Sequence, residues 1–261
     1  MPLLNFHTYG KIKTLFKRNE QGQLIDEWSH PVVGSIACWN VYEKIDGMNI
    51  RIGYQAACNE TEGKTLRYIG GRTDNSEIPS DLFTYLDTTF TLERLQEFFG
   101  DENGIIYGEG VGPKIQGGKA KGYDREELIA FDIVQGGQWR CDRESELQRL
   151  FDVKWAPYFG EYGVMVRDLN INKDNFESWE NYTLMRNIPT HMNNIKQWNR
   201  YRTTCVPEYI EGFIFRPHDR TKRAHLSPLY DLTLFDEHGD RVIFKLKRKD
   251  VFSDDIMPSK K

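Results

Sequence analysis

Residues 39–55, WNVYEKIDGMNIRIGYQ, constrain the fold of this chain more than any other segment. Two runs rich in Val, Ile and Tyr, which favour β-strands, flank the dipeptide Asp46-Gly47. An Asp-Gly pair between two such runs is typical of a β-hairpin, because glycine readily adopts the positive φ that a tight turn requires. The segment therefore predicts a strand, a tight turn and a second strand, with Lys44 and Asp46 beside the turn.

Other segments alternate between strand-like and helix-like patterns that are separated by turn residues. No repeat, low-complexity tract or flexible linker divides the chain. These patterns predict one α+β domain over residues 1–261, with mainly antiparallel sheets and flanking helices. Further strands are predicted at residues 64–71, 104–110, 127–134, 209–216 and 240–248, and helices at residues 81–100 with Gly100 as C-cap, at 142–150 with Asp142 as N-cap, and in the polar region 173–203.

The composition indicates a globular protein, because 39% of the residues are hydrophobic and 28% are charged. No apolar run approaches the length of a membrane span, and the N-terminus lacks the apolar centre of a signal peptide. We therefore expect a cytoplasmic protein with no membrane partner. The four cysteines include no C-x-x-C pair, which favours reduced thiols over a zinc site or a disulfide framework.

The net charge of −4 does not suggest a nucleic-acid-binding protein, but basic residues cluster late in the chain. They lie in RPHDRTKRAH, at residues 216–225, and in RVIFKLKRK, at residues 241–249. A local positive surface binds phosphates even when the whole protein is acidic. The net charge therefore does not exclude a nucleic-acid partner.

Charged residues lie at the ends of otherwise apolar predicted strands, where a core would favour apolar side chains. Lys245 and Lys247 in FKLK are two residues apart, so they share one face of a strand and repel each other unless an anion lies beside them. Carboxylates that face such lysines form structural ion pairs or bind a metal–phosphate group, and the pattern alone leaves both interpretations open. The residues at these strand ends are Lys44, Asp46, Glu109, Asp132, Glu211, Lys245 and Lys247.

Six short motifs occur in an order that is typical of one group of enzymes. EKIDGMN (43–49) fits the element K-x-[DH]-G-x-N of covalent nucleotidyltransferases. The chain most closely resembles the RNA ligase 2-like family, in particular its compact phage-type members, and the blocks YGKIKTLFKRNEQGQL, GGRTDNSEIP and YGEGVGPKIQGG also resemble that family. The motifs that follow the first along the chain are GGRT (70–73), YGEG (107–110), AFDI (130–133), EGFIFR (211–216) and FKLK (244–247).

This resemblance implies the nucleotidyltransferase fold, an ATP-grasp-like ligase adenylylation fold, without a C-terminal OB domain. It also implies an ATP-dependent RNA ligase that uses Mg²⁺ or Mn²⁺ and works in three steps. Lys44 attacks the α-phosphate of ATP and keeps AMP, AMP passes to a 5′-phosphate end of RNA, and a 3′-hydroxyl end then displaces AMP. We expect a monomer, and a protein partner is one way to replace the helical C-terminal domain of larger relatives.

The resemblance assigns roles to individual residues, of which Lys44, Lys245 and Lys247 are the implied catalytic ones. A lysine has an ordinary pKa of ~10.4, and neighbouring ammonium groups lower the pKa of a nucleophile. Asp132 and Glu211 would hold the metal ion, which prefers oxygen ligands. The implied nucleotide-binding residues are Glu43, Lys44, Asp46, Asn49, Arg72, Glu109, Phe131, Glu211, Lys245 and Lys247.

Four of the nucleotide-binding residues have specific implied contacts. Glu109 would accept a hydrogen bond from the ribose, and Phe131 would stack on adenine, although an aromatic side chain by itself more often indicates core packing. Arg72 would bind the ribose or a 5′-phosphate end, which suits a planar guanidinium. Asn49 would hydrogen-bond the nucleotide or its phosphate.

Two points remain open at this level. DNA ligases and GTP-using capping-type nucleotidyltransferases use the same lysine chemistry, and a non-catalytic nucleic-acid-binding relative would keep the same scaffold. Asp46 does not separate RNA ligases from DNA ligases, since some members of the RNA ligase family carry His at the equivalent position whereas DNA ligases and capping enzymes also use Asp. GPKIQGGKAKGYDR (112–125) lacks the pattern of a P-loop, so it is interpreted either as a flexible loop that contacts a nucleic-acid backbone or as a solvated surface loop.

Overall fold

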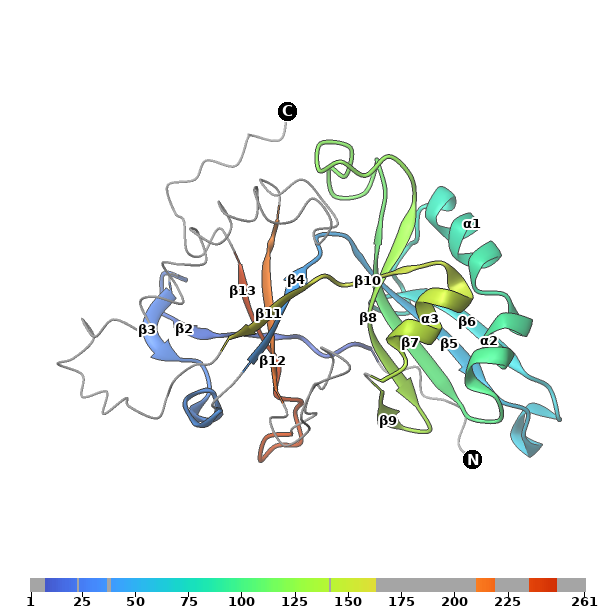
Figure 1. Cartoon of the computed structure of the whole chain (residues 1–261), viewed down its shortest axis with the longest axis horizontal. Helices are drawn as coiled ribbons and strands as arrows, with labels where there is room; N and C mark the ends of the chain where they lie inside the picture. The colour runs from blue at the N-terminus through green and yellow to red at the C-terminus, as the bar shows by residue number, and fades with distance from the viewer. Residues whose placement is uncertain are drawn as a thin grey trace. The chain divides into compact units, whose positions relative to one another are not determined.

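The computed structural model describes residues 8–22, 24–36, 39–140, 142–162, 210–218 and 235–247, and its sheets and helices confirm the α+β prediction (Figure 1). Most strand pairs are antiparallel, and β1–β13 and β10–β8 are parallel. The strands are β1 (Lys13–Thr14), β2 (Phe16–Arg18), β3 (Leu24–Trp28), β4 (Trp39–Lys44), β5 (Met48–Gln55), β6 (Leu66–Gly71), β7 (Gly104–Val111), β8 (Glu127–Gln135), β9 (Gln138–Trp139), β10 (Lys154–Trp155), β11 (Tyr158–Tyr162), β12 (Gly212–Pro217) and β13 (Phe244–Lys247). The helices are α1 (Ser80–Thr89), α2 (Leu92–Phe99) and α3 (Glu144–Phe151), with the short 3₁₀ helices η1 (Pro31–Ser35) and η2 (Asn59–Thr61).

The chain divides into two compact units. Unit 1 comprises Met1–Lys11 and Ile45–Ala156, and unit 2 comprises Ile12–Lys44 and Pro157–Lys261. Lys44 is therefore the last residue of a unit 2 segment, and Ile45 begins the next segment of unit 1. The single ligase domain predicted over residues 1–261 stays a prediction.

Unit 1 is built on a sheet with the strand order β10-β8-β7-β5-β6, to which β9 adds by pairing with β8. The three helices cover one face of this sheet (Figure 1). Apolar residues at helical spacing, such as Leu82 and Leu86 on α1, bury against strand residues such as Ile50 and Ile106. The apolar stripes of the helices thus explain why the predicted helices at residues 81–100 form and where they lie.

Unit 2 contains a five-stranded sheet in the order β1-β13-β12-β4-β11 and the two-stranded sheet β2-β3. Alternate residues on the central strands, such as Val41, Phe213 and Leu246, point into one apolar core. Period-two alternation places the intervening residues, among them Lys44 and Lys245, on the opposite face. Lys44 and Lys245 therefore do not point into that core, and their face of the sheet carries a smaller buried cluster that includes Tyr42 and Ile214.

The predicted hairpin at Asp46-Gly47 is wrong, although both strands form. Strand β4 pairs with β11 and β12, whereas β5 pairs with β6 and β7 in the other sheet. Gly47 is also not among the residues with positive φ. Position 47 requires glycine for a different reason: a Cβ there would lie only 2.5 Å from the carbonyl oxygen of Gly110 on β7. The turn signal therefore marks a close backbone approach at the point where the chain passes between sheets.

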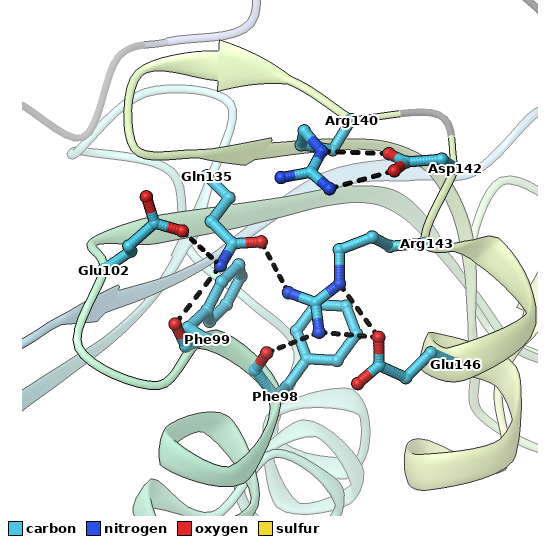
Figure 2. A network of polar contacts seen from close by, with 8 residues as sticks. All are labelled: Phe98, Phe99, Glu102, Gln135, Arg140, Asp142, Arg143 and Glu146. Carbon is cyan, nitrogen blue, oxygen red and sulfur yellow. Dashed lines mark hydrogen bonds and ion pairs between the residues drawn. The ribbon is translucent and has the colours of Figure 1, made fainter.

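The predicted N-cap of α3 is also wrong by one residue. The helix begins at Glu144 and has Arg143 at the N-cap position, without a side-chain cap. The carboxylate of Asp142 instead accepts two hydrogen bonds from Arg140, each 2.9 Å long (Figure 2). An aspartate that is engaged in this way does not cap the helix.

The Arg143 side chain binds residues of three elements of unit 1, namely β8, α2 and α3 (Figure 2). Its guanidinium donates hydrogen bonds to Gln135 Oε1 at 2.5 Å, to the carbonyl of Phe98 at 2.6 Å and to Glu146 at 2.7 Å. Gln135 in turn donates to the carbonyl of Phe99 at 3.2 Å. Two carbonyls at the C-terminal end of α2, which have no partner within the helix, thereby accept hydrogen bonds from Gln135 on β8 and from Arg143 at the N-cap position of α3.

We expect Arg143→Ala to lower the free energy of unfolding by about 2–3 kcal/mol, because it leaves largely buried acceptors without a donor. Chemical denaturation followed by circular dichroism measures this loss. Arg140→Ala is the matched control, since the Arg140–Asp142 pair is considerably exposed and should contribute less than about 0.5 kcal/mol. Equal losses in the two variants would contradict the role given to Arg143.

Several expectations fall on residues that the structure does not describe. The predicted helical region 173–203, the basic residues 219–225 and three of the four cysteines lie there. Cys58 is described and is a free thiol. Among the helices of the described ranges, none combines the length and apolar character that crossing a membrane requires.

Candidate active site

Three strands of unit 2 bring Lys44, Glu211 and Lys247 together. Strand β12 lies between β4 and β13, and Gly212 is the register partner of Lys44 on one side and of Lys247 on the other. Glu211 comes directly before Gly212 and forms ion pairs through both carboxylate oxygens, Oε2 with Lys44 and Oε1 with Lys247 at 2.5 Å. Three of the predicted site residues, separated by up to about two hundred positions in sequence, are therefore in direct contact.

The electrostatics of this cluster follow from partial burial and two opposed charges. Burial would raise the pKa of the Glu211 carboxyl, but the ammonium groups of Lys44 and Lys247 outweigh it and hold the pKa below its ordinary value. Glu211 is thus a carboxylate at neutral pH. It is an anion beside Lys247, one of the two lysines of FKLK.

Lys245 lies on the same face of β13 as Lys247, as the alternation in FKLK predicts. Phe244 and Leu246 point to the core, with 2% and 1% exposure, whereas the two lysines are only partly buried. Gly212 permits the close pairing at this end of the sheet, because a Cβ there would lie 2.1 Å from the carbonyl oxygen of Leu246. The glycine of the EGFIFR motif is therefore required by backbone packing.

Glu43 does not join this cluster. It is buried and pairs in register with Phe213, a residue of the unit 2 core. Because neighbours along a strand point to opposite faces, Glu43 lies on the face opposite Lys44. Its implied nucleotide contact stays a prediction.

Two other predicted residues, Asn49 and Glu109, are direct register partners on β5 and β7 of unit 1. The Oδ1 atom of Asn49 is buried and has no hydrogen-bond partner within the described part of the chain. A buried acceptor of this kind costs free energy unless a donor reaches it. Ribose hydroxyls and the adenine amino group are such donors, so this pair of strands suits a nucleotide.

Phe131 and Asp132 on β8 both contact Tyr9, which sequence reasoning did not single out. The Tyr9 hydroxyl donates to Asp132 Oδ2 at 2.5 Å, and the rings of Tyr9 and Phe131 meet edge to face at 5.1 Å. A register shift in the β7–β8 pair at Tyr107 places Phe131 in a bulge, where two consecutive residues can serve one neighbour. Tyr107 on β7 is the register partner of Asp132. Burial of the Tyr107 hydroxyl is the larger cause, and the negative charge of Asp132 the smaller one, that raises the pKa of Tyr107 to about 12.

Arg51, on β5, fixes the loop that carries Arg72. Its side chain is fully buried, and its Nε donates to the carbonyl of Gly71 at 2.7 Å. Its Nη2 donates to Asp74 Oδ1 at 2.7 Å and to the Tyr68 hydroxyl at 3.1 Å. The Arg51 guanidinium, together with the Tyr68 hydroxyl, holds the pKa of the Asp74 carboxyl below its ordinary value. Arg72 itself is exposed, and Arg51 binds the residues on either side of it, Gly71 and Asp74.

We expect Arg51→Met to raise the amide hydrogen-exchange rates of Thr73 and Ser76, which are hydrogen-bonded within the loop, by roughly ten-fold or more, because the loop loses about 1–3 kcal/mol of local hydrogen bonding. Nuclear magnetic resonance at neutral pH measures these rates. Arg67→Met is the control, since Arg67 binds the carbonyls of Asp87 and Phe90 and not the loop. Unchanged exchange in Arg51→Met would show that the loop holds its own conformation.

Asp46 pairs with a lysine that sequence reasoning did not assign to the site. Lys121 lies in the Gly- and Lys-rich segment, and its Nζ is 2.5 Å from Asp46 Oδ2. Lys121 is buried, so the interpretation of 112–125 as a solvated surface loop does not hold for this residue. No local pattern distinguishes Lys121 from Lys114 and Lys119 in the same segment.

Comparison with known proteins identifies the family of the chain. Residues 38–247 match the family described as RNA ligase, which covers most of the chain and all six motifs. The chain belongs to the RNA ligase family. No match was found among curated proteins.

Solved structures agree with the fold of this RNA ligase family member. An RNA ligase from Naegleria gruberi matches it both as a mutant with ATP and Mn and as the ligase with PPi, each with a TM-score of 0.53 and 15% sequence identity. The two matches cover 96% of this chain and 59% and 58% of the respective ligase chains. The chain therefore spans less than two thirds of the length of these structures.

The predicted metal ligands of this RNA ligase family member are Asp132 in unit 1 and Glu211 in unit 2. Within the described ranges, no three His, Cys, Asp or Glu side chains converge as a ready-made metal site. Mg²⁺ commonly binds through one or two carboxylates together with substrate phosphates and water. Asp132 and Glu211 each offer carboxylate oxygens of the kind that Mg²⁺ prefers, and their role as metal ligands stays a prediction.

Proposed function

We propose that this chain is an ATP-dependent RNA ligase that forms lysyl-AMP on Lys44, transfers AMP to a 5′-phosphate end and seals that end to a 3′-hydroxyl. The observation that carries the proposal is that Lys44 on β4 and Lys247 on β13 both form ion pairs with Glu211, which directly precedes β12. These are the lysines and the glutamate that the first, fifth and sixth motifs supply. Membership of the RNA ligase family supports the choice of chemistry.

In the first step, the amine of Lys44 attacks the α-phosphorus of ATP. The new N–P bond forms as the bond to the bridging oxygen breaks, and pyrophosphate leaves with that electron pair. Lys44 must lose a proton first, because an ammonium has no lone pair to donate. Its hydrogen-bond partner Glu211 is the carboxylate best placed to accept or relay this proton.

Lys247 and Lys245 would stabilise the phosphate group that reacts. Both lysines lie on the same face of β13, and Lys247 contacts Glu211 there. Their positive charges are therefore directed to one side of the sheet. Charge that develops on phosphate oxygens is stabilised by such fixed cations. A divalent ion, Mg²⁺ or Mn²⁺, would neutralise phosphate oxygens and assist the departure of pyrophosphate, with Glu211 and Asp132 as the proposed ligands.

The second and third steps need RNA ends, and their residues are proposals from the family resemblance. Arg72, on the loop that Arg51 organises, is proposed to bind the ribose or the 5′-phosphate end. Asn49, Glu109 and Phe131 are proposed nucleotide contacts, and the buried acceptor of Asn49 supports this role for one of them. A monomeric enzyme, or one completed by a protein partner, is part of the same proposal.

Incubation with radiolabelled ATP, GTP or NAD⁺, followed by a denaturing gel, tests the nucleotide. We expect label from ATP alone to stay on the protein and to be released by added pyrophosphate. A sealing assay on nicked duplexes with RNA or DNA at the 3′-hydroxyl side then tests the substrate. Retention of label from GTP, or equal sealing of DNA, would replace the proposal by a capping-type enzyme or a DNA ligase.

A further inference from the structure

Residues 112–123, in the loop between β7 and β8, are held together by backbone hydrogen bonds within the loop. The amide of Gly118 donates to the carbonyl of Ile115 at 2.8 Å, and the amide of Tyr123 donates back to the carbonyl of Gly118 at 2.9 Å. A Cβ at Gly118 would lie 1.9 Å from the carbonyl oxygen of Gly112, so only glycine fits there. Ile115 and Tyr123 are buried. The loop is therefore a fixed support for the side chains that it carries.

Lys121 is the one lysine of this loop whose side chain is largely buried, with 10% of it exposed. Its Nζ lies 2.5 Å from Asp46 Oδ2 and 3.4 Å from the carbonyl oxygen of Asp46. Burying an ammonium costs free energy unless a carboxylate and further acceptors compensate it. Both of these acceptors belong to Asp46, so the Lys121 ammonium binds the side chain and the backbone of one residue.

The segment that follows Lys44 is held from a second side as well. Gly47 lies so close to β7 that a Cβ would be 2.5 Å from the carbonyl oxygen of Gly110 and 3.0 Å from Val111 Cγ1. Lys121 thus fixes the side chain of Asp46, and β7 fixes the backbone of the next residue. Together they fix the segment in which the nucleophile motif ends.

We propose that Lys121 is a positioning residue for the ligase reaction, which acts by holding the carboxylate of Asp46. The proposal rests on the proposed function, because it assumes that Lys44 becomes adenylylated. A third of the Asp46 side chain is exposed, so without Lys121 its carboxylate turns to solvent. Asp46 is two residues from Lys44, and a small displacement of a reacting motif costs roughly 100-fold in rate.

The test is the rate of protein–AMP formation at saturating ATP for four proteins: wild type, Lys121→Met, Asp46→Asn and the double variant. We expect each single variant to react roughly 100-fold more slowly than wild type. We expect the double variant to be no slower than Asp46→Asn, because Lys121 acts only through the carboxylate. Lys114→Met is the matched control in the same loop, and with 83% of its side chain exposed it should react at the wild-type rate.

The outcomes separate this proposal from the proposed function. If wild type forms no adduct, or if Lys44→Ala still forms one, the proposed function fails first. If wild type reacts and Lys121→Met reacts at the same rate, the positioning role is overturned. Should Lys121→Met fail to fold, as judged by its thermal unfolding, the comparison of the double variant with Asp46→Asn still decides. A double variant that is clearly slower than Asp46→Asn would show that Lys121 acts on something else.

Discussion

Lys44→Ala is expected to abolish the protein–AMP adduct and to lower overall RNA sealing by more than about 1000-fold, since no other group replaces a covalent nucleophile. Lys44→Arg should fail equally, although it keeps the positive charge beside Glu211, because a guanidinium stays protonated. Transfer of radiolabel from ATP to the protein, resolved on a denaturing gel, measures the effect. The protein should remain folded, because Glu211 keeps its ion pair with Lys247.

The control for this experiment is Lys17→Ala. Lys17 lies in the same unit and forms an exposed ion pair with Glu27, so its removal should leave adduct formation unchanged. A second readout uses RNA that is already adenylylated at its 5′ end. Sealing of that RNA by Lys44→Ala would place the defect in adduct formation. An undiminished adduct in Lys44→Ala would move the nucleophile elsewhere and remove the basis of the mechanism.

Glu211→Gln is expected to slow adduct formation by roughly 100- to 1000-fold, because it removes the charge between the two lysines of the cluster and weakens a proposed metal ligand. It should also lower the free energy of unfolding by about 1–3 kcal/mol, since two ammonium groups that are partly buried lose their counter-ion. Glu27→Gln, on the exposed pair with Lys17, is the control and should change neither quantity. A stable Glu211→Gln protein with a normal rate would contradict both assignments.

The same variant gives this ion pair a measurable pH dependence. The folded pKa of Glu211 lies below its ordinary value of 4.5, so its stabilising contribution is complete above that pH. The contribution is lost as the pH falls through the pKa that Glu211 has in the folded protein. Below that pH the carboxyl is protonated in both the folded and the unfolded protein. The stability difference between wild type and Glu211→Gln should therefore shrink in acid. A constant difference from neutral pH into acid would show that charge is not its origin.

Local patterns predicted the elements of this fold better than their pairing. The alternation in FKLK placed Lys245 and Lys247 on one face of β13, and the apolar stripes located α1 and α2. The hairpin at Asp46-Gly47 failed because the partners of β4 and β5 are strands distant in sequence. A two-residue signal carries no information on which sheet each flanking strand joins.

The candidate site was predicted where charges interrupt apolar strands, and missed where no such contrast exists. Lys44, Glu211 and Lys247 meet as their motifs suggest. Lys121 lies among other lysines in a glycine-rich loop, and only the folded loop distinguishes it. Tyr9 was missed because its contact with Asp132 depends on a bulge in β8, which the strand pattern does not reveal. Arg51 did carry a signal, a charge in the middle of an apolar strand.

The register between the first and last described strands has a consequence for biosynthesis. Thr14 on β1 pairs with Lys245 on β13, and β4 pairs with β12, so the sheet under the nucleophile is completed by residues near the end of the chain. Contacts between such distant parts of a sequence form late and slowly. A nascent chain of only the first two hundred residues thus carries Lys44 before Glu211, its ion-pair partner, has been synthesised.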